Sequence, residues 1–365
     1  MDYMRIKKWA RTATIALWVS LMTSSCGGSG AGAGVSSSNN NIIGVARVPL
    51  NDLGSGNYLG YVGGLYPKGA NTPPTAHATL GLERAKAVIP RRADGTPDPA
   101  GKIVMVSIGM SNTTQEFCST AERSPTALCD PWTFMGQAAS DVAVNKNTLV
   151  IVNGALGSQV ATLWDSSTES NYDRILERHL IPQNLSEQQV QVAWVKVARA
   201  NPSISLPATN ADAYELLINL GNIMRALKVR YPNLQQVFLS SRIYGGYATT
   251  STLNPEPYAY ETGFAVKWLI QAQIDQMQNG FGVDMRAGEL DATNGTVPWL
   301  AWGPYLWADG MNVRSDGLMW ESSDFEMDFT HPAKKAETKV ANRLLTFFKE
   351  SEFTQCWFTN PGTCP

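Results

Sequence analysis

The chain has 365 residues, of which 44% are hydrophobic and only 16% are charged, so it can bury a core and does not belong to the disordered class. With 29 Lys and Arg against 31 Asp and Glu, the formal net charge is -2. This balance, with no basic block after the N-terminus, excludes nucleic-acid binding, which requires a basic face. The cysteine count is odd, five, so at least one cysteine has a role outside an internal disulfide.

The first 25 residues have the pattern of an export signal. Four basic side chains lie within residues 1–11, a mostly apolar run covers residues 13–22, and small residues lead to Cys26. The run is shorter than the ~20 apolar residues of a membrane-spanning helix, so an uncleaved anchor helix is the weaker alternative. Cys26 stands where a bacterial lipoprotein signal places its lipidated cysteine, although Thr23 occupies a usual leucine position. We therefore expect export, either lipid-anchored at the cell envelope through Cys26 or secreted.

The rest of the chain divides into four segments by composition. Residues 26–41 are rich in Gly, Ser and Asn, which predicts a flexible tether. Residues 42–100 are rich in Gly and Pro with few periodic apolar positions, so we expect an extended segment that packs on the main domain. The main domain is predicted over residues 101–350, and residues 351–365 form a C-terminal tail.

The main domain alternates between strand and helix patterns. Short runs rich in β-branched residues, each ending near Gly, Asn, Pro or a polar residue, predict buried parallel strands over residues 102–108, 148–152, 190–195 and 236–240. Apolar residues at helical spacing predict helices over residues 212–229, 258–277 and 333–348. This alternation predicts an α/β fold, a doubly wound parallel sheet with helices on both faces.

Candidate site residues follow from the positions of the strand ends, because ligands bind beyond the carboxyl ends of the strands in such sheets. Ser111 comes directly after the first predicted strand, where a lone serine is usually a turn residue. A nucleophilic serine needs a base, and the base needs a carboxylate that orients it. Asp328-Phe329-Thr330-His331, just before the last predicted helix, supplies both. Asp328 as a helix cap and His331 as an ordinary helix-terminal residue are the alternatives, and the pairing with Ser111 favours catalysis.

These residues resemble the motifs of the SGNH (GDSL-type) hydrolase family, and the resemblance covers residues 101 to about 350. It implies a flavodoxin-like α/β/α sandwich with Ser111 as nucleophile, His331 as base and Asp328 as the orienting acid. It also implies an oxyanion hole made by the N–H groups of Ser111 and Gly157 and the side chain of Asn201. No metal ion or organic cofactor is expected for this chemistry.

The chain departs from the family pattern at two places. Met110 stands where the family has Asp before the serine, and residues 199–202 have the sequence Arg-Ala-Asn-Pro in place of Gly-x-Asn-Asp. The side-chain donor of the oxyanion hole therefore stays open among Asn201, Asn112 and Arg199. Gly154 is the alternative to Gly157 as the glycine whose N–H contributes to the oxyanion hole.

The four cysteines beyond the export signal predict two small disulfide-closed loops, since an exported protein folds in an oxidising compartment. The predicted pairs are Cys118 with Cys129 and Cys356 with Cys364. No Cys-x-x-Cys motif or histidine cluster supports a metal site instead. Of the other histidines, His77 is expected in a loop and His179 on the surface of a helix.

The resemblance implies a serine esterase that acts through an acyl-enzyme on an ester substrate, and the signal pattern of residues 1–25 adds that it is exported. Five aromatic residues precede Asp328, and as a cluster they favour an acetylated carbohydrate, because aromatic rings stack on sugar C–H faces. Each of them alone is better explained as a core residue: Trp299, Trp302, Tyr305, Trp307 and Trp320. The alternatives are a lipase or general carboxylesterase, an acyltransferase, and a carbohydrate-binding surface protein whose catalysis has decayed.

Overall fold

The computed structural model describes residues 46–119, 127–250, 253–278 and 282–362. The predicted export signal, the tether and Cys26 lie outside the described residues, and so does Cys364. Within the described ranges, no helix is both long enough and apolar enough to cross a membrane.

A five-stranded parallel sheet forms the centre of the main domain. Its order is β4-β3-β5-β6-β7, which is the 2-1-3-4-5 order of a flavodoxin-like doubly wound sheet. All seven residues of β3 and of β5 are buried, because helices cover both faces of the sheet. The predicted fold class is therefore confirmed. The strands are β3 (Ile103–Gly109), β4 (Leu149–Val152), β5 (Val190–Lys196), β6 (Gln236–Leu239) and β7 (Trp299–Trp302).

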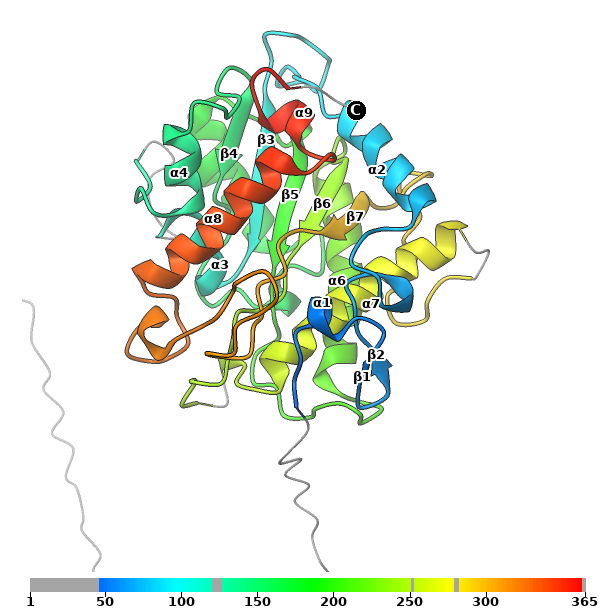
Figure 1. The fold of residues 1–365 in the computed structure, drawn as a ribbon. Coiled ribbons are helices and arrows are strands. Elements are labelled where there is room, and N and C mark those ends of the chain that lie inside the picture. Colours follow the sequence, from blue (N-terminus) through cyan, green and yellow to red (C-terminus); the bar gives the residue numbers. More distant parts are fainter. Residues whose placement is uncertain (1–45, 120–126, 251–252, 279–281, 363–365) are drawn as a thin grey trace, which may run out of the picture. The chain divides into compact units, whose positions relative to one another are not determined.

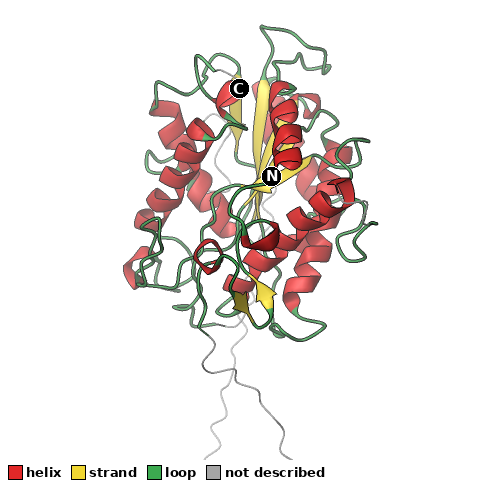
Figure 2. Ribbon diagram, turned by 45° about the vertical axis from the view of Figure 1, so that its right-hand side comes forward, coloured by secondary structure: helices red, strands yellow, loops and turns green. Residues whose placement is uncertain are grey.

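Two helical layers enclose this sheet, as Figures 1 and 2 show. Alternate strand residues point to opposite layers, so that Val104 and Val106 join one hydrophobic core while Ile103 and Met105 join the other. The first layer contains α5 (Ser170–Ile175), α6 (Asp212–Arg230) and α7 (Tyr258–Gln278). The second contains α2 (Thr75–Lys86), α3 (Ser111–Cys118), α4 (Phe134–Ser140), α8 (Lys334–Glu350) and α9 (Gln355–Phe358).

The segment before the sheet has more regular structure than its composition indicated. It contains α1 (Leu50–Leu53), an antiparallel hairpin of β1 (Asn57–Tyr58) and β2 (Tyr61–Val62), and the twelve-residue helix α2. Helix α2 packs closely on β7, where a Cβ at Gly81 would lie 2.4 Å from the Trp299 ring. This close approach explains a glycine inside a helix, which is otherwise unfavourable.

The aromatic cluster expected at the cleft is buried instead, so this part of the sequence interpretation was wrong. The five aromatic residues are at most 4% exposed, and two of them belong to β7. Each indole N–H donates to an acceptor within the fold, which is the usual requirement for a buried tryptophan. The four hydrogen bonds run from Trp299 to the His77 carbonyl (3.0 Å), from Trp302 to the Leu65 carbonyl (2.6 Å), from Trp307 to the Glu256 carboxylate (2.7 Å) and from Trp320 to the Leu306 carbonyl (3.0 Å).

Both remaining histidines are buried, contrary to expectation. His77 lies on α2 at 1% exposure with Nε2 2.8 Å from the Leu300 carbonyl oxygen, and burial lowers its pKa to about 4. His179, at 7% exposure, lies in the π-helical turn Leu176–Leu180, and burial followed by the charge of Arg174 lowers its pKa to about 4. Both therefore serve as neutral core residues.

The disulfide between Cys118 and Cys129 is confirmed, and it joins the end of α3 to the segment before α4. Cys356 is itself disulfide-bonded. Because Cys364 lies outside the described residues, its pairing with Cys356 stays a prediction.

Candidate active site

The serine, histidine and aspartate that the sequence singled out lie side by side. Ser111 is the first residue of α3, directly beyond the carboxyl end of β3. Its Oγ lies 2.8 Å from Nε2 of His331, and Nδ1 of His331 is hydrogen-bonded to Oδ2 of Asp328. This is the nucleophile–base–acid geometry of a Ser-His-Asp triad.

The acid and the base share one tight loop, the Asp–His loop (residues 326–331). The Glu326 N–H donates to the His331 carbonyl at 2.8 Å, so the two ends of the loop are joined. Inside it, Phe329 has a left-handed φ of 54°, a conformation that costs a non-glycine residue about 1–3 kcal/mol. Oδ1 of Asp328 accepts the N–H groups of Thr330 and His331, each at 2.9 Å. The strained turn therefore fixes the carboxylate under the imidazole.

These hydrogen bonds also set the charge of Asp328. Burial by itself raises the pKa of this carboxyl group, but the hydrogen bonds from the His331 side chain and from the loop N–H groups lower its pKa below the ordinary value. Asp328 is therefore ionised at neutral pH and can hold His331 in the tautomer that leaves Nε2 free to accept the serine proton.

Three consecutive side chains after Ser111 fasten α3 to its neighbours, and all three are at most 2% exposed. One binds the Asp–His loop, one binds the end of β5, and one binds the residue after β4. These three contacts fix the position of α3 and therefore the position of Ser111 relative to His331. The contacts are Asn112 Nδ2 to the Thr330 carbonyl (3.0 Å), Thr113 Oγ1 to the Lys196 carbonyl (2.6 Å) and Asn153 Nδ2 to Thr114 Oγ1 (2.6 Å).

A buried ion pair adds a fourth attachment of α3 that the sequence did not indicate. Nζ of Lys196, at the end of β5, lies 2.5 Å from both carboxylate oxygens of Glu116, and the two side chains are 1% and 0% exposed. Burial raises the pKa of Glu116, and burial lowers the pKa of Lys196 to about 8. The guanidinium of Arg242 is also buried, and its positive charge offsets part of the rise in the pKa of Glu116.

The two glycines weighed for the oxyanion hole have different surroundings. A Cβ at Gly154 would lie 2.6 Å from the Ser107 carbonyl oxygen, so Gly154 is needed for close packing. A Cβ at Gly157 would meet no atom within 4 Å, so Gly157 faces open space. The adjacent Leu156 N–H donates to the Gly109 carbonyl at 3.2 Å, which places this segment beside the residues that lead to Ser111. Gly157 is therefore the better candidate for an oxyanion donor.

The three candidate side-chain donors also differ. The amide of Asn112 is already used on the Thr330 carbonyl, as described above. The guanidinium of Arg199 is hydrogen-bonded to Asn219 at 3.0 Å and lies 3.5 Å from Asp212. Asn201 is exposed, with a left-handed φ of 48°, and no described hydrogen bond occupies its side chain. The structure does not bring Asn201 into contact with Ser111, so the side-chain donor stays a prediction among these three residues.

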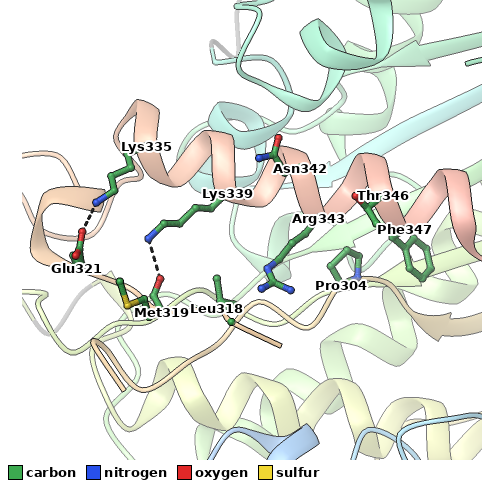
Figure 3. Close-up of a pocket in the computed structure, with 11 residues that line it drawn as sticks. Pro304, Leu318, Met319, Glu321, Lys335, Lys339, Asn342, Arg343, Thr346 and Phe347 are labelled. Atoms are coloured by element: carbon green, nitrogen blue, oxygen red, sulfur yellow. Dashed lines mark hydrogen bonds and ion pairs between the residues drawn. The ribbon is translucent and has the colours of Figure 1, made fainter. Parts of the chain in front are cut away.

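A large cavity of about 630 Å³ lies along α8, between this helix and residues 317–321 (Figure 3). Two of its cationic side chains bind groups of that segment: Lys335 pairs with Glu321, and Lys339 donates to the Met319 carbonyl at 2.9 Å. The third, Arg343, pairs with Asp316 at 2.7 Å. The cavity is therefore bordered by contacts that hold the chain leading to the Asp–His loop. Among the residues that the structure describes, no three or more His, Cys, Asp or Glu side chains are grouped so that they could hold a metal ion.

No protein-family model matches the sequence, and no curated protein matches it either. Similar solved structures include a catalytic mutant of an acetylxylan esterase from Geobacillus stearothermophilus, with 14% identity, 69% of this chain and 96% of that chain covered, and a TM-score of 0.37. A carbohydrate esterase family 2 enzyme from Corynascus thermopiles (Myceliophthora fergusii) shows 14% identity, coverage of 68% and 67%, and a TM-score of 0.32. A GDSL-like lipase from Parabacteroides merdae shows 10% identity, coverage of 71% and 96%, and a TM-score of 0.34.

The sheet order and the contact between Ser111 and His331 test the expectation from the sequence motifs without reference to these solved structures. The strand order is the flavodoxin-like one, and the serine and the histidine meet at the carboxyl edge of the sheet. Both observations agree with the fold and the order of site residues that the resemblance to the SGNH (GDSL-type) hydrolase family implies.

Proposed function

We propose that the protein is an exported serine esterase that removes acetyl groups from carbohydrate. The single observation that supports ester hydrolysis best is the 2.8 Å contact between Ser111 Oγ and His331 Nε2, with Asp328 on the other ring nitrogen. A serine hydroxyl in this position is activated by proton transfer to the imidazole.

In the proposed mechanism, His331 takes the proton of Ser111 while Oγ attacks the ester carbonyl carbon. The N–H groups of Ser111 and Gly157 hold the oxyanion that forms. The bond to the alcohol oxygen then breaks, and His331 passes its proton to the departing alcohol. A water molecule gives a proton to His331 and attacks the acyl carbon, after which Oγ leaves with that proton and the carboxylic acid is released.

Exposure of the site favours a small acyl group on a bulky alcohol. The side chains of His331 and Asp328 are 25% and 42% exposed, so the triad lies near the surface. A surface triad is accessible to an ester that projects from a polymer, whereas a long acyl chain needs a deep apolar pocket to cover it. We therefore place acetylated carbohydrate before lipid as the substrate class.

Initial rates on short-chain chromogenic esters test the esterase assignment. We expect 4-nitrophenyl acetate to be hydrolysed faster than the octanoate, and Ser111→Ala to abolish both rates. Ser140→Ala, at an exposed serine that ends α4, is the matched control and keeps the wild-type rate. Equal rates for Ser111→Ala and the wild type would overturn the assignment, and acetate release from acetylated xylan tests the carbohydrate part.

Export and lipid attachment form a separate part of the proposal. They rest on the signal-like residues 1–25 and on Cys26. Metabolic labelling with a fatty acid should mark the wild-type protein and leave Cys26→Ser unmarked. Equal labelling of both proteins would contradict lipid attachment at this cysteine.

A further inference from the structure

A second, smaller cavity lies on the other helical layer from α3 and α8. It has a volume of about 300 Å³ and is lined by α6, α7, the hairpin residue Tyr61 and the chain after α7. Figure 1 shows the β1–β2 hairpin beside these two helices. Three aromatic residues form one wall of this aromatic pocket, and polar side chains form its rim. Its volume is at the lower end of the ~300–1,000 Å³ range of small-molecule sites.

The aromatic wall is held rigidly by its own contacts. Tyr214 stacks on Trp268 with ring centres 5.0 Å apart and planes 14° apart. Tyr61 meets Trp268 edge-on at 5.3 Å, and its hydroxyl lies 2.7 Å from that of Tyr214. All three side chains are half-buried, in contrast to the fully buried tryptophans before the Asp–His loop. A preformed aromatic surface loses little conformational entropy when a ligand binds.

The rim offers both hydrogen-bond donors and acceptors. Asp284 is fixed because its Oδ1 accepts the N–H groups of Arg286 and Ala287 at 2.8 and 2.7 Å. The Arg286 guanidinium lies 4.1 Å above the Tyr214 ring, and no ion pair is described for it. Gln271 and Asp275 follow Trp268 on the same face of α7. Amide, carboxylate and guanidinium groups around an aromatic wall match the hydroxyls and C–H face of a sugar ring.

We propose that the aromatic pocket binds a neutral saccharide segment, and thereby holds a polysaccharide on the protein at a place separate from the triad. The rim has two carboxylates, Asp275 and Asp284, against one guanidinium, so its charge does not favour an acidic polymer. Binding at the pocket requires neither Ser111 nor His331. The inference is therefore independent of ester hydrolysis.

Affinity electrophoresis of the full chain in gels that contain a soluble polysaccharide tests this site. The Ser111→Ala protein serves as the background, so that no substrate is consumed during the run. We expect retardation by soluble xylan or glucomannan, and none by polygalacturonate. In the same background we expect a dissociation constant at least about tenfold higher for two variants, Trp268→Ala and the double variant Gln271→Ala/Arg286→Ala. A tenfold increase corresponds to ~1.4 kcal/mol of binding free energy. Arg178→Ala, at an exposed arginine outside the pocket, is the matched control and keeps the retardation.

The outcomes separate this inference from the proposed function. Absence of retardation by both neutral polysaccharides, retardation by polygalacturonate alone, or unchanged retardation of the pocket variants would each overturn it. If Trp268→Ala fails to fold, the double variant decides, since its two side chains lie on the rim. Failure of the esterase proposal would instead appear as an absence of ester hydrolysis by the unsubstituted protein, whatever the gels show.

Discussion

The buried pair of Glu116 and Lys196 gives the sharpest prediction about what holds helix α3, and with it Ser111, in place. Replacing Lys196 by Met keeps the side-chain volume and removes the cation. Glu116, at 0% exposure, then has a buried carboxylate without its partner. Removal of one partner from a buried ion pair costs about 3–5 kcal/mol, a large part of the ~5–15 kcal/mol stability of a typical domain.

The structure places the expected value at the lower end of that range. The guanidinium of Arg242 lowers the pKa of Glu116 and compensates part of the unpaired charge. We therefore expect Lys196→Met to lose about 3 kcal/mol of unfolding free energy at neutral pH. The double variant Lys196→Met/Glu116→Leu, which replaces both charges by apolar groups, should lie within about 1 kcal/mol of the wild type. We also expect both the ester hydrolysis rate and the unfolding free energy to fall in the single variant, because α3 carries Ser111.

Urea unfolding followed by tryptophan fluorescence measures these free energies. Lys196→Met, the single variant Glu116→Leu and the double variant together form a double-mutant cycle. Lys267→Met is the matched control. Lys267 is 3% exposed and its Nζ donates to the carbonyls of Val62 (2.5 Å) and Gly63, so its removal leaves no buried charge behind. Its cost should therefore be smaller, about 1–3 kcal/mol from the carbonyls that lose a donor.

The pH dependence distinguishes a buried charge from lost packing. Burial raises the pKa of Glu116 already in the wild type, and removal of Lys196 takes away the largest effect that lowers it. A carboxyl group whose pKa is raised on folding stabilises the folded state below its unfolded pKa and loses that contribution as pH rises through the folded pKa. Relative to the wild type, Lys196→Met should thus be least destabilised near pH 4 and most destabilised near pH 7, because Lys196 in the wild type loses its own proton as the pH rises through about 8. A loss below ~1 kcal/mol, or a double variant as unstable as the single one, would refute the assignment of this pair.

Three further predictions concern the triad and its supports. Asp328→Asn should lower kcat by about 10⁴-fold with little change in the melting temperature, because the imidazole loses the partner that fixes its tautomer; a change below tenfold would contradict this role. Asn112→Ala should cost about 1–3 kcal/mol in urea unfolding, since the buried Thr330 carbonyl loses its donor, and should lower kcat more than it changes KM. Gly154→Ala should destabilise the fold by about 1–3 kcal/mol through overlap with a carbonyl oxygen, whereas Gly157→Ala, which faces open space, should be close to neutral; equal losses would refute the distinction.

The strands and helices of the main domain were predictable because their patterns are local. Four strands and three long helices lie within two residues of the ranges that the sequence predicts. Strand β7 was missed, since Trp299–Trp302 is short and its two tryptophans were interpreted as part of a ligand cleft. Its burial depends on α2 and β6, and neither contact is visible in a four-residue segment.

The position of the triad was predictable for a different reason. The topology of a doubly wound sheet brings strand ends together, so a serine after β3 and a histidine before α8 meet at one edge. The pairing of Glu116 with Lys196 was not predictable, because 80 residues separate them and a buried charge is recognised only when its surroundings are known. Similarly, both glycines at the end of β4 fit the motif, and only the surrounding atoms distinguish Gly154 from Gly157.

The central claim is that Ser111 is a nucleophile activated by His331, and covalent labelling tests it most directly. A fluorophosphonate probe reacts with an activated serine and forms a stable adduct that intact-mass and peptide mass spectrometry locate. We predict one adduct, on Ser111, with labelling abolished in Ser111→Ala and strongly slowed in His331→Ala. A folded wild-type protein that stays unlabelled, or that is labelled at another residue, would contradict the account.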